Sequence, residues 1–261
     1  MSKRGFTAEL ADQEDPEIGC ELIRIHFEDG RTEELRLHDY ERLYSLPGVY
    51  EQIVQNRLGC RSPAQLASML AAAVDRVGWD RSAVRVLDVA AGNGVSGEAL
   101  AAEGLEPVLG TDIVPAAQAA AARDRPGLYG AYLILDLLAL SAEDRRAVRG
   151  WAANALACVA PVGDCSQQLP PLALTAAAEL LEPDAVIAYM LDPGAGAPDV
   201  VTPAFWAEHL GAGTRAEELE RRRYVHRYTV NGEPFEMECV VWRIRRALDR
   251  RTSRALEPPA P

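Results

Sequence analysis

The segment from Gly92 to Gly97 contains residues whose types and spacing are typical of a nucleotide site. Its sequence, GNGVSG, follows the pattern Gly-x-Gly-x-x-Gly and lies between a predicted strand at 84–89 and a predicted helix at 95–103. Glycines in such a turn let the backbone approach a ligand closely. Asp112 ends the next predicted strand, where its carboxylate can accept hydrogen bonds from ribose hydroxyls. Taken alone, the pattern also fits an NAD site.

Two further carboxylates at predicted strand ends favour a different ligand. Asp88 precedes Gly92 by four residues, at a place where dinucleotide sites are normally apolar. A carboxylate there suits a ligand with an ammonium group and a sulfonium rather than a pyrophosphate. Asp136, in LILDLLAL, can accept a hydrogen bond from an adenine amine. Capping of a turn or helix is the structural alternative for Asp88 and Asp112, but open α/β sheets bind ligands where their strands end.

Short apolar strands alternate with Ala- and Leu-rich helices from residue 84 onward, which predicts a parallel sheet with helices on both faces. The predicted strands are 84–89, 106–112, 131–136, 154–160 and 184–191, and the predicted helices are 95–103, 115–124, 142–153 and 171–182. Thr202-Pro203 begins a further helix, and Thr214 predicts another. Two final strands, at 223–230 and 235–244, are expected to form an antiparallel hairpin.

The N-terminal part has a different pattern. Its first 20 residues are polar and acidic, which is typical of disorder. Alternating apolar residues on both sides of Asp29-Gly30 predict a β-hairpin, and helical periodicity follows it. The expected units are a disordered acidic N-terminus at 1–20, a β-hairpin and helical lid at 21–80, a core at 81–247 and a flexible tail at 248–261.

Four segments, in order, resemble the motifs of class I (Rossmann-like) S-adenosylmethionine-dependent methyltransferases: VLDVAAGNG, LGTDIVPAA, AYLILDLLAL and NALACVAPVG. The chain departs from the first motif once, where Ala90 replaces the first glycine. The resemblance implies a doubly wound α/β fold with a seven-stranded, mostly parallel sheet of order 3-2-1-4-5-7-6, whose last strand is antiparallel. It also implies S-adenosylmethionine as cofactor and S-adenosylhomocysteine as product.

The resemblance assigns a cofactor site as well. Asp112 would bind the ribose hydroxyls, Ile113 would pack on the adenine, and Asp136 with Leu137 would lie beside it. The implied cofactor-binding residues are Asp88, Ala90, Gly92, Asn93, Gly94, Asp112, Ile113, Asp136, Leu137 and Val159.

No motif indicates a catalytic residue, because methyl transfer relies on positioning and needs a base only if the nucleophile arrives protonated. The candidates are His226, in the penultimate predicted strand, and Tyr40, which with Tyr44 and Tyr50 is expected to line the lid. A structural role is the favoured alternative for His226, and core packing is the alternative for Tyr44. No group of residues has the spacing of metal ligands.

Composition limits the partners. A formal net charge of −12 disfavours nucleic acid, and no apolar run is long enough to span a bilayer. The five cysteines, at positions 20, 60, 158, 165 and 239, form no CxxC pair and are typical of reduced thiols in a cytoplasmic protein. We therefore expect a small-molecule acceptor that is methylated at O or N. The Ala-, Arg- and Gly-rich composition suggests a bacterial enzyme of secondary metabolism.

Alternatives stay open at this stage. The chain can be a non-catalytic or protein-directed S-adenosylmethionine-binding protein. An NAD-dependent oxidoreductase is disfavoured, because no Tyr-x-x-x-Lys pair occurs and Lys3 is the only lysine. The hairpin at 21–38 is a candidate contact for a homodimer.

Overall fold

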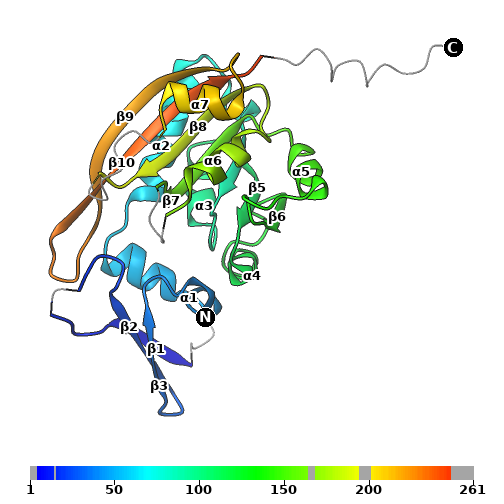
Figure 1. Ribbon diagram of the computed structural model, residues 1–261. Helices are drawn as coiled ribbons and strands as arrows, with labels where there is room; N and C mark the ends of the chain where they lie inside the picture. Colours follow the sequence, from blue (N-terminus) through cyan, green and yellow to red (C-terminus); the bar gives the residue numbers. More distant parts are fainter. Residues whose placement is uncertain (1–4, 15, 164–167, 194–200, 248–261) are drawn as a thin grey trace.

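A seven-stranded sheet forms the centre of the protein. The computed structural model describes residues 5–14, 16–163, 168–193 and 201–247. The sheet has the order β6-β5-β4-β7-β8-β10-β9, and β10 runs antiparallel to both its neighbours (Figure 1). This is the predicted order, antiparallel strand included. The strands are β4 (Arg85–Val89), β5 (Glu106–Asp112), β6 (Ala131–Ile134), β7 (Ala155–Pro161), β8 (Asp184–Leu191), β9 (Arg215–Tyr228) and β10 (Pro234–Arg245).

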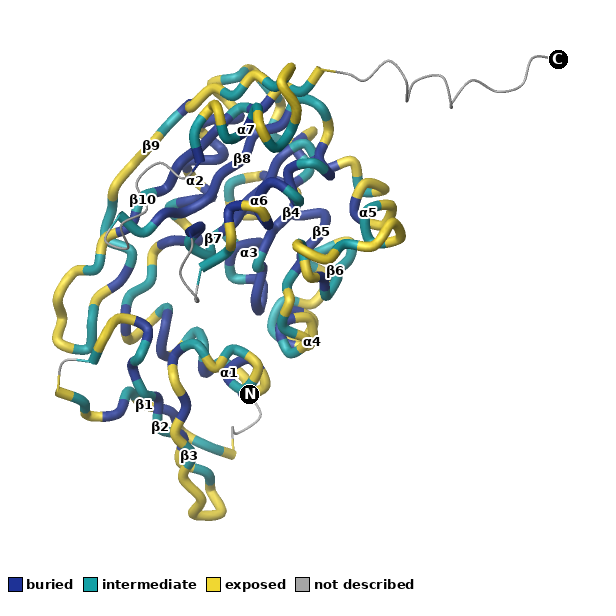
Figure 2. Tube along the Cα trace, viewed as in Figure 1, coloured by how far each residue is buried: buried dark blue, intermediate teal, exposed yellow. Residues whose placement is uncertain are grey.

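Helices cover both faces of this sheet, as the alternating pattern predicts. On one face, α2 (Ser62–Arg76) and α3 (Val95–Ala102) pack against residues such as Val86 and Ala188. On the other face, α5 (Ala142–Arg149), α6 (Pro171–Ala178) and α7 (Pro203–Leu210) pack against residues such as Leu87 and Ile187. α4 (Pro115–Asp124) follows β5. The central strands are buried almost throughout (Figure 2), which is typical of parallel strands covered on both faces.

The predicted helix after Thr214 is wrong. Residues 215–228 form the long edge strand β9, which pairs with β10 from Arg215 opposite Arg245 to Tyr228 opposite Pro234. The Thr214 hydroxyl does not cap a following helix but donates to the carbonyl of Leu210, at the end of α7. Only one side chain between 215 and 222 is buried. The many charged residues of this segment are typical of an exposed helix, but its backbone forms the edge strand of the sheet.

The N-terminal segment forms a separate three-stranded antiparallel sheet of β1 (Phe6–Leu10), β2 (Leu22–Phe27) and β3 (Thr32–Arg36). The predicted hairpin is present as β2 and β3. The expectation of disorder through residue 20 is wrong for β1, whose apolar residues alternate and whose Phe6 ring contacts Phe27. Residues 1–4, Cys165 and the predicted tail at 248–261 lie outside the described residues.

The helical lid, defined here as residues 37–61, connects this sheet to the core. It contains α1 (Tyr40–Ser45) and a short π-helix, η1 (Glu51–Arg57). The N-terminal sheet lies near the turn between β9 and β10 (Figure 1), and Glu21 makes a buried ion pair with Arg227 of β9 at 2.6 Å. Backbone hydrogen bonds also join the lid to β9, from Arg61 N to His226 O and from Tyr228 N to Leu58 O. No helix among the described residues is long and apolar enough to cross a membrane.

Candidate cofactor and acceptor site

A cavity of about 770 Å³ lies between the carboxyl ends of the central strands, the lid and the final hairpin. Its volume is within the range of about 300–1,000 Å³ for small-molecule sites. Most of the sequence-predicted site residues line it: Ala90, Gly92, Asn93, Asp112, Ile113, Asp136, Leu137, Val159, Tyr40 and His226. Asp88 and Gly94 do not.

The loop after β4 has a left-handed backbone at three positions. Gly92 has φ +54° and Gly94 has φ +88°, values that glycine adopts without strain. Ala90 also has φ +54°, a conformation that is strained for alanine and that glycine adopts without this strain. A Cβ on Gly92 would overlap the hydroxyl of Tyr44, and the Gly92 carbonyl accepts a hydrogen bond from the Tyr132 hydroxyl at 2.7 Å. The loop is therefore fixed by tyrosines on two sides.

Asp112 holds this loop against the end of β5. Its Oδ2 accepts a hydrogen bond from Gly92 N at 2.9 Å, and its Oδ1 accepts one from Val114 N at 2.9 Å. Burial raises the pKa of this carboxyl, and the backbone hydrogen bonds oppose the increase. Each oxygen keeps a second lone pair, and the residue lines the cavity. A ligand with paired hydroxyls can therefore bind to Asp112 without displacing the loop.

Asp88, which the sequence predicts as a cofactor-binding residue, lies behind the cavity wall and not in its lining. Side chains alternate along β4, so Leu87 and Val89 face one core cluster while Asp88 points to the other side, toward α3. The residue is 0% exposed, and its Oδ2 accepts hydrogen bonds from Ser96 Oγ and the Tyr129 hydroxyl, both at 2.7 Å. Its Oδ1 has no partner among the described residues. Burial raises the pKa of Asp88 to about 7. Asp88 thus holds the glycine loop from behind.

Gly94 has a similar structural role. It precedes the first residue of α3, and a Cβ there would press on the side chains of Arg125 and Leu128. Glycine at this position serves packing between α3 and the segment after α4.

A second group of residues forms an apolar edge beyond β5 and β6. Ile113 is 63% exposed and Leu138 is 58% exposed, although both line the cavity. Asp136 lies two residues after β6 and is exposed, and its Oδ1 accepts a hydrogen bond from Leu138 N at 2.9 Å. Uncovered apolar side chains beside an exposed carboxylate can hold a flat heterocycle that carries an amine.

Three tyrosines of the lid line the cavity, and the hydroxyl of Tyr44 lies next to Gly92 of the glycine loop. The rings of Tyr40 and Tyr44 stack at 5.5 Å, and those of Tyr44 and Tyr50 are tilted at the same distance. Burial raises the pKa of all three, that of Tyr40 to about 12, so they stay protonated at neutral pH. Tyr44 is only 7% exposed, which agrees with the core-packing alternative, but all three line the cavity.

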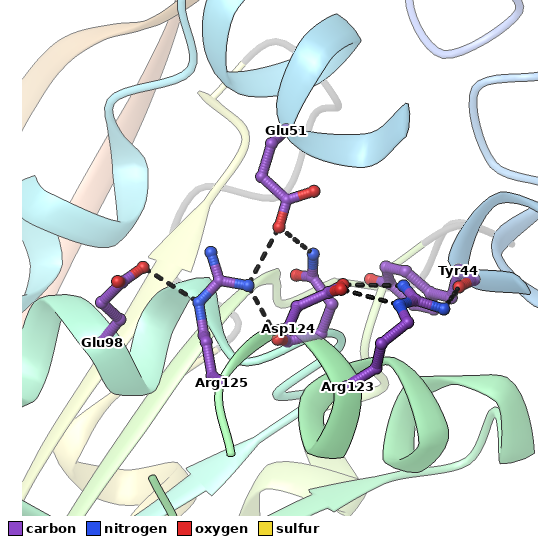
Figure 3. Close-up of polar contacts among 7 residues, drawn as sticks. Tyr44, Glu51, Glu98, Arg123, Asp124 and Arg125 are labelled. Carbon is purple, nitrogen blue, oxygen red and sulfur yellow. Dashed lines mark hydrogen bonds and ion pairs between the residues drawn. The ribbon is translucent and has the colours of Figure 1, made fainter. Parts of the chain in front are cut away.

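A polar network ties the lid to the core (Figure 3). Glu51 of η1 accepts hydrogen bonds from Arg125 Nη1 at 2.9 Å and from Asn93 Nδ2 at 2.7 Å. Arg125 also binds the Asn93 carbonyl and Glu98 of α3. Sequence reasoning missed this network and the Asp88 partners, because their members are far apart in the chain and follow no motif. Only Ser96, inside the glycine-rich motif, carried a local signal.

His226 lines the opposite end of the cavity, near the final hairpin. Its Nδ1 lies 2.5 Å from Ser62 Oγ at the start of α2 and 4.0 Å from Cys60 Sγ. Burial lowers the pKa of His226 to about 3, and the Arg227 guanidinium contributes to the decrease. The imidazole is therefore neutral at physiological pH.

No protein-family model and no curated protein matches the sequence. Solved structures with similar folds include a proposed RNA methyltransferase from Pyrococcus horikoshii, with 17% identity over 73% of this chain and 89% of that one and a TM-score of 0.49. Another is magnesium protoporphyrin IX methyltransferase from Synechocystis with bound S-adenosylmethionine, with 16% identity over 71% and 80% and a TM-score of 0.43.

The decisive observation is the sheet itself, whose order and antiparallel β10 are those that the motif resemblance implies. The chain has the class I methyltransferase fold. A TehB-like methyltransferase from Corynebacterium glutamicum, with 19% identity over 68% of this chain and 91% of that one and a TM-score of 0.41, is also among the similar structures.

Proposed function

We propose that this protein is an enzyme that transfers a methyl group from S-adenosylmethionine to an O or N nucleophile of a small-molecule acceptor, such as a bacterial secondary metabolite. The observation that carries the proposal is the cavity where β4, β5, β6 and β7 end, because it contains the glycine loop, Asp112 and the Ile113 edge together. Ligands of open α/β sheets bind at this edge.

The residues present fit the cofactor. Asp112 has lone pairs available for the ribose hydroxyls, Ile113 and Leu137 offer apolar surface for the adenine, and Asp136 has an exposed carboxylate for its amine. Ala90 and Asn93 line the side where the amino-acid end of the cofactor would lie. The cofactor would supply a methyl group on a positively charged sulfur, which a lone pair of the acceptor takes while the electron pair of the broken bond stays on sulfur.

An NAD-dependent oxidoreductase is the weaker alternative. The classic dinucleotide-binding sheet has the order 3-2-1-4-5-6, whereas here the antiparallel β10 lies between β8 and β9. Asp112 and the glycine loop do not distinguish the two ligands. The antiparallel strand therefore supports the methyltransferase proposal.

A small acceptor is favoured by charge and by the lid. The net charge of −12 opposes an RNA or DNA substrate, and the lid closes one side of the cavity through the Glu51–Arg125 contact. The four described cysteines, at positions 20, 60, 158 and 239, are free thiols, which supports a reducing, cytoplasmic setting. The homodimer through residues 21–38 stays a prediction, which light scattering can test.

The test is a comparison of ligands by isothermal titration calorimetry. We expect S-adenosylhomocysteine to bind and NAD to give no heat. Asp112→Ala should weaken S-adenosylhomocysteine binding at least ten-fold, since a ligand that uses both hydroxyls loses charge-assisted hydrogen bonds of about 1.5–3 kcal/mol each. Leu172→Ala, on an exposed residue of α6 that does not line the cavity, is the control. Binding of NAD without binding of S-adenosylhomocysteine would refute the proposal.

A further inference from the structure

The glycine loop after β4 has few free acceptors for the ammonium group at the amino-acid end of the proposed cofactor. Asp88 points away from the cavity. The loop carbonyls at positions 91, 92 and 93 already accept hydrogen bonds, from Gly94 N at 2.9 Å, from the Tyr132 hydroxyl at 2.7 Å and from Arg125 Nη1 at 3.0 Å. A side chain of the loop is therefore the next group to consider.

Asn93 provides such a side chain. The residue is only 2% exposed, yet it lines the cavity. Its Nδ2 donates a hydrogen bond to Glu51 Oε1 at 2.7 Å, and its Oδ1 has no hydrogen-bond partner within the described part of the chain. Oδ1 is not sealed from the cavity, in contrast to Glu51 Oε2, which is buried without a partner. A largely buried amide with a free oxygen at the cavity wall is a preorganised acceptor for an N–H group of a ligand.

Glu51 determines which way the Asn93 amide points. A carboxylate that is paired with a guanidinium only accepts hydrogen bonds, so the amide atom that faces it must belong to the NH₂ group. Arg125 Nη1 fixes both partners, because it donates to Glu51 Oε1 at 2.9 Å and to the Asn93 carbonyl at 3.0 Å. Without Glu51, no described side chain would hold the amide, and its NH₂ group could turn toward the cavity and repel an ammonium group.

The charges of this network favour a cation. Arg125 is paired with two carboxylates, Glu51 and Glu98, each at 2.9 Å, so the three side chains together carry one net negative charge. The Arg125 side chain is 12% exposed, and partly buried ion pairs are screened less by salt than exposed ones. The guanidinium beside Asn93 is therefore more than neutralised.

The lid contributes to this arrangement through one residue. Glu51 extends from η1 toward Arg125 (Figure 3), and it does not itself line the cavity. We infer, on the basis of the proposed function, that Asn93 Oδ1 accepts a hydrogen bond from the ammonium group of the cofactor and that Glu51 is the positioning residue that orients this amide. The amino-acid end of the cofactor is then fully recognised only while the lid is docked on the core.

The role of Asn93 is tested with three ligands that share an adenosine part. Isothermal titration calorimetry at pH 7 compares S-adenosylhomocysteine, its analogue without the α-amino group, and 5′-methylthioadenosine, which lacks the whole amino-acid end. We expect Asn93→Ala to weaken S-adenosylhomocysteine binding at least ten-fold, or about 1.4 kcal/mol, as for a hydrogen bond to a charged group. The affinities for the other two ligands should change less than about two-fold. Equal weakening of all three, or unchanged binding of S-adenosylhomocysteine, would overturn the inference.

The role of Glu51 is tested through the same selectivity. Glu51→Ala should weaken S-adenosylhomocysteine binding about five-fold or more and leave 5′-methylthioadenosine unaffected. Glu51→Gln keeps an oxygen that can accept both hydrogen bonds, so it should retain most of the affinity. Glu98→Ala is the matched control, because it removes the other carboxylate paired with Arg125 without a contact to Asn93.

A double variant shows whether Glu51 acts through Asn93. Glu51→Ala should cause no further loss of S-adenosylhomocysteine affinity in an Asn93→Ala background. Additive losses, or the same loss in Glu98→Ala, would overturn the positioning role. Wild-type protein that binds 5′-methylthioadenosine as tightly as S-adenosylhomocysteine would overturn the inference and leave the proposed function in place. Wild-type protein that binds neither ligand would contradict the proposed function itself.

Discussion

Replacement of Asp88 by asparagine should change how stability depends on pH. In the folded protein burial raises the pKa of Asp88 to about 7, against an ordinary value of 3.8. Between these two values the folded state binds a proton that the unfolded state has lost. Because stability falls with pH wherever the folded state binds more protons, the wild-type free energy of unfolding should decrease as pH rises toward 7.

The size of this effect follows from the two pKa values. Each pH unit within the window changes the free energy of unfolding by about 1.36 kcal/mol. Integrated from pH 5 to pH 8, the loss is about 2.5 kcal/mol. The asparagine of the variant does not titrate, and its amide oxygen can still accept the hydrogen bonds of Ser96 and Tyr129. The stability of Asp88→Asn relative to wild type should therefore improve by about 2.5 kcal/mol over this range, whatever its value at pH 5.

The assay is urea unfolding followed by circular dichroism at several pH values, with wild type and variant compared at each. A second variant tests the cause. Tyr129→Phe removes a hydrogen bond that lowers the pKa of Asp88, so the stability loss should move to higher pH. Parallel stability curves for wild type and Asp88→Asn would refute the reasoning, since they would mean that the carboxyl is already ionised at pH 5 in the folded protein.

Three further predictions concern the loop and the lid. Ala90→Gly should raise the free energy of unfolding by about 0.5–1 kcal/mol, because glycine removes the strain of φ +54° at a smaller entropic cost; a destabilised variant in urea unfolding would contradict this. Gly92→Ala should cost at least about 1 kcal/mol, and Tyr44→Phe should recover part of the loss by removing the overlapping hydroxyl; purely additive effects in the double variant would show that the overlap is unimportant. Glu51→Gln should weaken the Arg125 contact and speed amide exchange in η1 about five-fold, the effect of losing about 1 kcal/mol; unchanged exchange would mean that the contact does not hold the lid.

The alternation of strands and helices predicted a parallel sheet, and the short turn near the end predicted the final hairpin, but the order of the strands was implied only by the resemblance to class I methyltransferase motifs. The strands at the edges of the two sheets were harder to predict from the sequence. The charged segment 215–222 has a helix-like composition, and only its pairing with β10 over the full strand length makes it a strand. Likewise β1 is short, and its alternation is visible only once β2 is beside it. Long-range backbone pairing decided both cases.

The lining of the cavity was predictable from the sequence for residues at the carboxyl end of a central strand, where open α/β sheets bind ligands. Asp112 and Ile113 line the cavity for this reason. Asp88 does not, because it pairs with Gly110, two residues before Asp112 on the same face of the sheet, and Ser96 and Tyr129 cover it there. The sequence also could not indicate that Ser62 meets His226, since these residues are 164 positions apart and come together only through docking of α2 on β9.

The buried ion pair between Glu21 and Arg227 has a consequence for how the chain is made. About 200 residues separate the two, which corresponds to about 10–40 s of translation at typical rates. During that interval the N-terminal sheet has left the ribosome while the partner of its buried carboxylate is not yet synthesised. Burying an unpaired charge is costly, so the sheet should dock onto the core only after β9 has emerged. The end of the cavity that surrounds His226 is then among the last parts of the protein to be assembled.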